Sequence, residues 1–325
     1  MRILFIQLGR IGDMILSTPV FRAIKEKYPD AEINVIAGRH NYSVISNNPR
    51  INKIIIHKKP PVFVLINIFR IRKHFYDYLI DPKDHYSRES RYFAWITKAK
   101  MKIGYNQPGR KIFDKGVPGM LENKDMHFTL RHFQALEPLG IEMPNEAPRP
   151  ELFPSSSSEK YVKEFIDRMP GKKLAVINIS ASKENKMWQY DKWIKTLKKT
   201  DFSGWNVALT SAPAEYEMAK YISEKAKFPF LFKSRKMDDV ISLIKNSDML
   251  ITPDTSLVHV ASAFNVPLFG LFSGLYAQFN KFSPLMDDYT VVRAKEGDPG
   301  ILSIEPGDVI EKLKEILGNK KNNSG

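Results

Sequence analysis

Three polar residues, Asp254, Thr255 and Ser256, have the pattern of an anion-binding segment. They follow the short apolar run 249–251 and open a helical pattern. Helices begin preferentially at Asp, Ser and Thr, because their side-chain oxygens accept hydrogen bonds from the unpaired amides of the first turn. A strand that leads into such a helix presents free N–H groups and the positive end of the helix dipole. The segment therefore predicts either an anion site, with His259 one turn further along, or an ordinary capped helix.

A carboxylate occupies a similar place near residue 1. The segment 1–8 is strand-like, the turn 9–13 ends at Asp13, and a helical pattern over 14–28 comes next. In doubly wound folds the end of the first strand faces the ligand crevice. Asp13 is therefore either a general base for a sugar hydroxyl or a capping residue of the helix, and the sequence supports both interpretations equally.

The turn before Asp13 does not match a dinucleotide-binding site. Its spacing is Gly9-x-x-Gly12, whereas the dinucleotide fingerprint is G-x-G-x-x-G. The second strand-like run ends in Ala-Gly-Arg at 37–39, where an acidic residue for the ribose is expected. A nicotinamide enzyme is therefore disfavoured, and no cofactor is expected.

A third polar cluster follows the run 174–179 and contains Ser180 and Lys186. A lysine beside hydroxyls and amides is suited to hold a pyrophosphate as a mobile point charge. The other interpretation is a solvated loop. Trp188, two residues further on, is expected in the core because a large aromatic ring is usually buried.

Basic residues gather after the run 78–80. Arg88 and Arg91 are one helical turn apart, so we expect them to clamp a phosphate or carboxylate together, and Arg110 follows among further basic residues. No zinc-finger, RRM or helix-turn-helix pattern accompanies them, so nucleic acid is not expected as a partner. The seven histidines lack metal-ligand spacing, so no metal site is expected.

The charge of the chain is unevenly distributed. Residues 1–150 contain 25 Lys and Arg against 14 Asp and Glu, whereas residues 151–325 contain 25 against 22. A basic first half indicates an anionic partner, either a phosphorylated substrate or an anionic membrane surface, unless the whole proteome is basic. No run of about 18 apolar residues is present, and cysteine is absent, which fits a reducing cytoplasm.

The elements that must position these residues alternate along the chain. Strands followed by helices are typical of βαβ units around a parallel sheet. Strands are expected at 1–8, 32–37, 54–56, 78–80, 174–179, 206–210, 230–232, 249–251 and 268–272, and helices at 14–28, 62–73, 190–199, 215–227 and 306–317.

Prolines and a serine run divide the alternation in two. We expect a first domain over 1–154, a flexible linker at about 155–158, and a second domain over 159–325. The C-terminal helix 306–317 is expected to pack back on the first domain. Two such halves predict two doubly wound sheets facing a central cleft.

Four blocks of sequence, in this order and at plausible distances, resemble glycosyltransferase family 9, the ADP-heptose:lipopolysaccharide heptosyltransferase family. They are residues 3–6 through Gly12-Asp13 to Thr18-Pro19; Asp81 through Arg88 to 103–105; Lys186-x-Trp188 followed by Trp193; and Asp254-Thr255 through His259 to Val266-Pro267.

The resemblance implies an α/β fold of GT-B architecture and metal-independent transfer of a heptose, with inversion, from a nucleotide-diphosphate donor to a lipopolysaccharide core acceptor. It implies ADP-heptose as donor, a cytoplasmic enzyme, and peripheral contact with the inner membrane. Asp13 resembles the family's general base and Lys186 its donor-phosphate lysine. The resemblance implies a donor-binding second domain, 159–325, with the donor at Ser180, Lys186, Asp254, Thr255, Ser256, Leu257 and His259. It implies an acceptor-binding first domain, 1–154, with the acceptor at Arg10, Gly12, Arg88, Arg91 and Arg110.

Two residues depart from the family pattern. Ser256 stands where Gly is usual, and Gln189 where Pro is frequent. The alternative to an enzyme is a non-catalytic protein of the same fold that binds a nucleotide sugar or an anionic glycolipid, and Ser256 is the only support for it.

Overall fold

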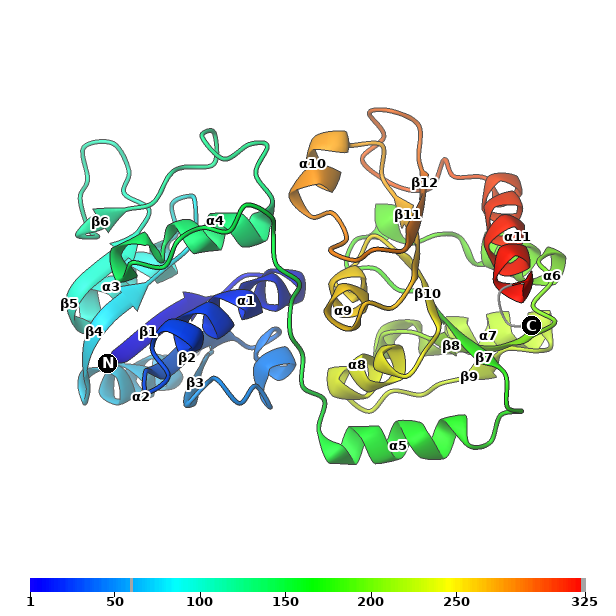
Figure 1. Cartoon of the computed structure of the whole chain (residues 1–325), viewed down its shortest axis with the longest axis horizontal. Helices are drawn as coiled ribbons and strands as arrows, with labels where there is room; N and C mark the ends of the chain where they lie inside the picture. Colours follow the sequence, from blue (N-terminus) through cyan, green and yellow to red (C-terminus); the bar gives the residue numbers. More distant parts are fainter. Residues whose placement is uncertain (59–60, 323–325) are drawn as a thin grey trace. The chain divides into compact units, whose positions relative to one another are not determined.

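A computed structural model describes residues 1–58 and 61–322 of the chain, and it divides them into two α/β units (Figure 1). The first unit comprises Met1–Phe153 together with Asn280–Ser283, and the second comprises Pro154–Phe279 together with Pro284–Gly325. The predicted second domain, 159–325, ends in residues 323–325, which lie outside the described residues.

The first unit is built on a parallel six-stranded sheet in the order β3-β2-β1-β4-β5-β6. The order reverses beside the first strand, between β1 and β4, which is where doubly wound sheets bind their ligands. The strands are β1 (Arg2–Gln7), β2 (Glu32–Gly38), β3 (Lys53–His57), β4 (Phe75–Ile80), β5 (Lys98–Gly104) and β6 (Lys115–Gly116).

Alternate side chains of β1 enter different parts of the core. Leu4 and Ile6 join a cluster with Ile71 and Phe93, which belong to two helices on that face of the sheet. Phe5 instead packs edge to face against Phe21 of the first helix, with ring centroids 5.1 Å apart. The helices of this unit are α1 (Ile11–Lys27), α2 (Pro61–Arg72), α3 (Arg88–Ile96) and α4 (Phe128–Gln134), with 3₁₀ turns η1 (Tyr42–Ile45) and η2 (Glu137–Leu139).

The second unit repeats this plan, with a parallel sheet in the order β12-β11-β10-β7-β8-β9. Its strands are β7 (Lys173–Asn178), β8 (Trp205–Thr210), β9 (Phe230–Leu231), β10 (Met249–Pro253), β11 (Leu268–Phe272) and β12 (Tyr289–Arg293). Its helices are α5 (Ser156–Ile166), α6 (Tyr190–Lys199), α7 (Tyr216–Ala226), α8 (Met237–Lys245), α9 (Leu257–Phe264), α10 (Tyr276–Lys281) and α11 (Pro306–Asn322), with 3₁₀ turns η3 (Glu184–Lys186) and η4 (Pro213–Glu215).

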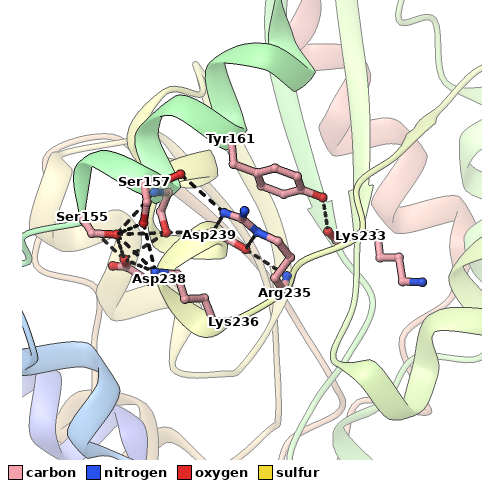
Figure 2. A network of polar contacts seen from close by, with 9 residues as sticks. Ser155, Ser157, Tyr161, Lys233, Arg235, Lys236, Asp238 and Asp239 are labelled. Carbon is pink, nitrogen blue, oxygen red and sulfur yellow. Dashed lines mark hydrogen bonds and ion pairs between the residues drawn. The ribbon is translucent and has the colours of Figure 1, made fainter.

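The serine run at 155–158 is not a flexible linker, and that prediction is wrong. Ser155 is the N-cap of α5, and its side chain accepts a hydrogen bond from the amide of Ser158. Ser155 Oγ also donates to Asp238 (2.5 Å), and Ser158 Oγ donates to Asp239 (2.7 Å), so the start of α5 is tied to the start of α8 (Figure 2). Serine favours the N-cap for the same reason that it favours loops, because its hydroxyl bonds to nearby backbone amides. The serine composition alone therefore does not distinguish a helix N-cap from a flexible linker.

The same polar network, drawn in Figure 2, contains a basic residue from the loop before α8. The guanidinium of Arg235 donates from Nε and Nη2 to the two carboxylate oxygens of Asp239, at 3.0 and 2.8 Å, and lies 3.7 Å from the centre of the Tyr161 ring. The hydroxyl of Tyr161 donates to the carbonyl of Lys233 (2.8 Å). These contacts fix the segment by which the chain enters the second unit.

The C-terminal helix α11 is part of the core of the second unit, and its packing on the first domain stays a prediction. Val309, Leu313 and Leu317 of α11 are buried in the same cluster as Trp193 of α6. Their spacing of four residues places them on one face of the helix. The Trp188 indole N–H donates to the carbonyl of Ile304 (3.0 Å), just before α11, and Trp188 is buried as expected.

Several elements were absent from the sequence-based expectation, among them α3, β5, α8 and β12. Strand β5 alternates Lys with Ala, Met and Ile. Because of its three lysines the segment does not have the apolar composition by which the other strands were predicted, although it forms a strand near the edge of the sheet. Among the described residues, no helix is both long enough and apolar enough to cross a membrane.

Candidate functional site

Asp13 lies in the first turn of α1, directly beyond the carboxyl end of β1. The N-cap of α1 is Arg10 and not Asp13, but Asp13 does cap the helix from its third position, because its Oδ2 accepts a hydrogen bond from the amide of Arg10 (2.7 Å). Burial raises the pKa of Asp13 above its usual range, and the Arg10 amide and the charges of Arg10, Lys281 and Lys83 lower it in part. A carboxylate with a raised pKa is a stronger base, so capping and general-base chemistry are compatible in this residue.

The turn that presents Asp13 requires a glycine. A β-carbon on Gly9 would collide with Asp13 Oδ2 and lie 2.9 Å from Gln7 Oε1. Asn41, which is fully buried, holds the same turn from the neighbouring loop: its Nδ2 donates to the carbonyls of Gly9 (2.8 Å) and Gln7 (3.1 Å). The backbone that carries Asp13 is therefore fixed on both sides.

A buried polar chain supports the next turn of α1. Gln7 Nε2 donates to Ser17 Oγ (3.0 Å), and Ser17 Oγ donates to the carbonyl of Asp13 (2.7 Å). His132 Nδ1 lies 3.1 Å from Ser17 Oγ. Burial lowers the pKa of His132 to about 3, so the ring is neutral at physiological pH. Because the Ser17 proton is directed to Asp13, His132 acts as an Nδ1–H donor in this arrangement.

A buried ion pair lies in the same unit. Arg131 Nη1 donates to Asp84 Oδ2 (2.5 Å), and His85 Nδ1 lies 2.9 Å from Asp84 Oδ1. Burial alone would raise the pKa of Asp84, but the hydrogen bonds from His85 and Arg131 hold it well below its usual range. Lys281 is close enough for its charge to act on both Asp84 and Asp13.

The predicted acceptor residues fall into two groups. Arg10 and Gly12 flank Asp13, at the N-cap and in the first turn of α1. Arg88 and Arg91 lie on α3, which follows β4, and the guanidinium of Arg91 lies 5.3 Å from the centre of the Tyr86 ring. Arg110 is exposed in a turn, where its amide donates to the carbonyl of Gln107. Within the described part of the chain, Arg88, Arg91 and Arg110 form no hydrogen bond or ion pair with Asp13, and their role in acceptor binding stays a prediction.

In the second unit, Lys186 is paired with Asp254. Lys186 ends η3, its side chain is largely buried, and its Nζ contacts Asp254 Oδ2 directly beyond β10. The Lys186 ammonium group, which the sequence suggests as a mobile point charge, is therefore held by Asp254 in this structure. An anion that binds to Lys186 must either share the ammonium group with the Asp254 carboxylate or displace that carboxylate.

The carboxyl ends of β7 and β10 are joined by a row of hydrogen bonds. Asn178 Nδ2 donates to Thr252 Oγ1 (2.9 Å) and to the carbonyl of Ser180 (2.9 Å). Thr252 Oγ1 lies 3.3 Å from Thr255 Oγ1, and Thr255 Oγ1 accepts from the amide of Leu257 (3.2 Å). The structure thus brings the predicted donor residues Ser180, Thr255 and Leu257 to one edge of one sheet.

The amino end of α9 has the form of an anion site. Its N-cap, Ser256, makes no side-chain capping bond, and among the described residues the amides of Thr255 and Ser256 make no backbone hydrogen bond. His259 is buried in the first turn of this helix. Ser256 has φ −60° and ψ −19°, which any residue adopts, so the departure from Gly adds a side chain without straining the backbone.

The other departure is also accommodated. Gln189 is the N-cap of α6 with φ −62°, a value that proline would share, and its carbonyl accepts from the Trp193 amide (3.1 Å).

The sequence did not reveal several residues of these two edges. Glu215 Oε2 accepts a hydrogen bond from Ser180 Oγ (3.1 Å), although it lies 35 residues away along the chain. Lys281 and His132 join the Asp13 region, and Arg131 pairs with Asp84, from segments that carry no motif. Such residues could be identified from sequence only by a signal that connects distant segments of the chain.

A family model described as glycosyltransferase family 9 (heptosyltransferase) matches residues 68–301. A lipopolysaccharide heptosyltransferase 3 of Escherichia coli strain K12 is 27% identical over 286 residues, which are 80% of this chain and 79% of that protein. The solved ADP-heptose lipopolysaccharide heptosyltransferase II of E. coli has a TM-score of 0.78 and 20% identity, covering 99% of this chain and 100% of its own.

A second solved structure, an E. coli heptosyltransferase with ADP, has a TM-score of 0.76 and 16% identity, covering 97% of this chain and 99% of its own. At these identities the solved structures are informative about the fold alone. They confirm the GT-B class that the sequence predicts.

Proposed function

Because the chain belongs to glycosyltransferase family 9, we propose that it transfers a heptose, or a related sugar, from a nucleotide-diphosphate donor to a lipopolysaccharide core acceptor. The donor that we propose is ADP-heptose, which the name of one solved relative contains. The observation that carries the proposal is the position of Lys186, which contacts Asp254 directly before the amino end of α9, because a diphosphate that takes the place of the Asp254 carboxylate would meet an ammonium group and the amides of Thr255 and Ser256.

Asp13 is the proposed general base. The acceptor hydroxyl loses its proton to the Asp13 carboxylate as its oxygen bonds to the anomeric carbon of the donor. The bond from that carbon to the diphosphate oxygen breaks, and the nucleoside diphosphate leaves with the electron pair. Attack from the face opposite to the leaving group inverts the anomeric centre.

Lys186 and the amides of Thr255 and Ser256 are the proposed stabilisers of the leaving diphosphate. Negative charge grows on its oxygens in the transition state, where fixed donors are most effective. An ammonium group and a helix amino end supply there the positive charge that many transferases take from a divalent metal, so we propose transfer without a metal ion.

We also propose that the enzyme works at the cytoplasmic face of the inner membrane, in peripheral contact with it. The support is the basic first half of the chain and the lipid-linked nature of the proposed acceptor.

Two measurements test the proposal. The first is transfer of heptose from ADP-heptose to a purified lipopolysaccharide core acceptor, followed by mass spectrometry of the product. The second is thermal unfolding with ADP, UDP, GDP and CDP, because a ligand that binds only the folded state raises the unfolding temperature. Stabilisation by another nucleotide and not by ADP would overturn the choice of donor. Binding without any transfer would favour the non-catalytic alternative.

A further inference from the structure

The outer side of α2 and α3 exposes large apolar side chains among basic ones. Phe69 is 81% exposed and Trp95 is 73% exposed, and Ile66 and Phe75 are exposed as well. The neighbouring side chains of Arg70, Arg72 and Lys73 are also exposed. We call these seven residues, together with Lys98, the α2–α3 surface.

Helix geometry separates this surface from the core. On α2, Asn67 and Ile71 are buried, and Asn67 Nδ2 donates to the carbonyl of Ile56 in β3 (3.2 Å). Phe69, two residues from each of them, points the other way, and Arg70, Arg72 and Lys73 are exposed as well. On α3, Phe93 is buried in the core beneath the sheet, and Trp95 faces solvent. The hydrophobic core therefore does not account for Phe69 or Trp95.

The surface is continuous from one helix to the other. Phe69, Arg70, Arg72 and Lys73 line one open hollow. Arg72 reaches from α2 to α3, where its Nε donates to the carbonyl of Ile96 (3.4 Å) and its guanidinium lies 5.8 Å from the centre of the Trp95 ring. Phe75, at the start of β4, stands beside Lys98 in the register of β4 and β5.

The charge of the surface is positive and unpaired. Within the part of the chain that the structure describes, Arg70, Arg72, Lys73 and Lys98 form no ion pair, whereas Lys100 nearby is paired with Asp77 at 2.6 Å. Aromatic rings surrounded by unpaired Lys and Arg are the composition of a surface that sits in the headgroup region of an anionic bilayer.

We infer that the α2–α3 surface docks the enzyme on a bilayer of anionic lipids, with Phe69 and Trp95 entering the headgroup layer and the four basic residues facing lipid phosphates. The inference rests on the proposed function for its location, since the proposed acceptor is anchored in such a bilayer. None of the residues that carry it is assigned to the donor, to the acceptor or to the general base, so docking and catalysis are separable by mutation.

Vesicle binding by the full chain tests the inference directly. The probes are vesicles of phosphatidylethanolamine and phosphatidylglycerol in a 7:3 ratio, and vesicles of phosphatidylcholine alone, both analysed by co-sedimentation. We expect binding to the anionic vesicles, weakened by salt, and little binding to phosphatidylcholine. Each Lys or Arg near an anionic surface contributes about fivefold to partitioning, so Arg70→Gln/Arg72→Gln/Lys73→Gln is expected to reduce binding about 100-fold.

A second variant tests the apolar part, and each variant has a matched control. Phe69→Ser/Trp95→Ser is expected to lower partitioning about tenfold or more, because it removes two rings from the headgroup layer. Leu121→Ser is its control, since Leu121 is 88% exposed on a loop outside the surface. Lys195→Gln/Lys198→Gln/Lys199→Gln, three exposed lysines on α6, is the charge control. Thermal unfolding verifies that every variant is folded.

The outcomes separate docking from catalysis. Equal binding by the wild-type chain and the surface variants, or equal binding to both vesicle types, would overturn the inference. So would a dimer in solution that depends on Phe69 and Trp95, because the surface would then meet protein instead of lipid. Transfer to a delipidated core acceptor should be unchanged in the surface variants. A chain that binds anionic vesicles through this surface but transfers no sugar would refute the proposed function and leave the docking surface intact.

Discussion

Gly9 and Asp13 lie so close together that residue 9 has no room for a side chain. A β-carbon there would occupy the position of Asp13 Oδ2 and press on Gln7 Oε1. The glycine is needed for space and not for an unusual backbone angle, since its φ lies outside the left-handed region. The position of the proposed base thus depends on a missing methyl group.

Gly9→Ala is therefore expected to displace the Asp13 carboxylate. A shift of about 1 Å in a reacting group costs on the order of 100-fold in rate, so we expect a loss of that size in kcat. Steady-state kinetics with both substrates measures it. Gly204→Ala is the matched control, because nothing lies within 4 Å of a β-carbon at that position. Full activity in Gly9→Ala would show that the carboxylate does not act from its observed position.

Asp13→Asn separates the chemical role of the side chain from its structural one. The amide oxygen still accepts from the Arg10 amide, so the cap is retained, but the general base is lost. We expect kcat to fall about 100- to 10,000-fold with nucleotide affinity unchanged. The unfolding temperature should not fall, because a buried carboxylate with a raised pKa opposes folding at neutral pH. Asp125→Asn, at an exposed position, is the control. Retained turnover would refute the base assignment.

Lys281 should set the pH at which Asp13 becomes active. Its positive charge lowers the pKa of Asp13, against the larger effect of burial. Lys281→Gln removes that charge, so the pKa of Asp13 rises and the acid limb of the kcat/KM profile moves to higher pH. Lys124→Gln, at an exposed position, should leave the limb in place. A pH profile of Lys281→Gln identical to that of the wild type would contradict the coupling.

Lys186 should carry much of the affinity for a nucleoside diphosphate. A hydrogen bond to a charged group contributes about 1.5–3 kcal/mol, so Lys186→Gln is expected to weaken ADP binding about 10- to 100-fold. Calorimetric titration measures the change. Lys192→Gln is the control, since Lys192 lies in the same unit but bonds to the carbonyls of Leu302 and Ile304. Equal losses in the two variants would show that the effect is not local.

Arg131 and Asp84 make a prediction about stability. Arg131→Met leaves a buried carboxylate without its cation, which costs about 3–5 kcal/mol at pH 7. The pKa of Asp84 is depressed in the folded state, so the stability it adds is present above its unfolded pKa of about 3.9 and is lost as the pH falls through the folded value. The difference in the free energy of unfolding between Arg131→Met and the wild type should therefore become smaller below about pH 4. Urea unfolding from pH 7 to pH 3 measures it, and a constant difference would contradict the assignment.

The local sequence pattern was sufficient to predict most of the strands and helices on which each unit is built. The sequence-based ranges for α6 (190–199) and β11 (268–272) coincide with the structure, because strong periodicity and clear boundaries agree there. Asp13 and Asp254 were placed correctly just beyond strands, because a strand followed by a capped helix start is itself a local pattern.

What the sequence did not yield depends on contacts between distant residues. Lys186 and Asp254 are 68 residues apart, and nothing near either one identifies its partner. Arg131 reads as one more surface cation until the fold buries it against Asp84. A large aromatic residue such as Trp95 is usually buried, and its exposure follows from the angular position of α3 on the sheet, which one residue's hydrophobicity does not specify.

The segment Asn280–Ser283 groups with the first unit, although the chain before and after it belongs to the second. A protein assembled from two relatives by joining them after residue 153 would therefore have a composite first unit. Its Lys281 would come from the parent that supplied the second half, while its Asp13 came from the other. The acceptor preference of such a hybrid should accordingly depend on two separate stretches of sequence, 1–153 and 280–283. Replacing residues 280–283 by those of the first parent should restore that parent's preference in full.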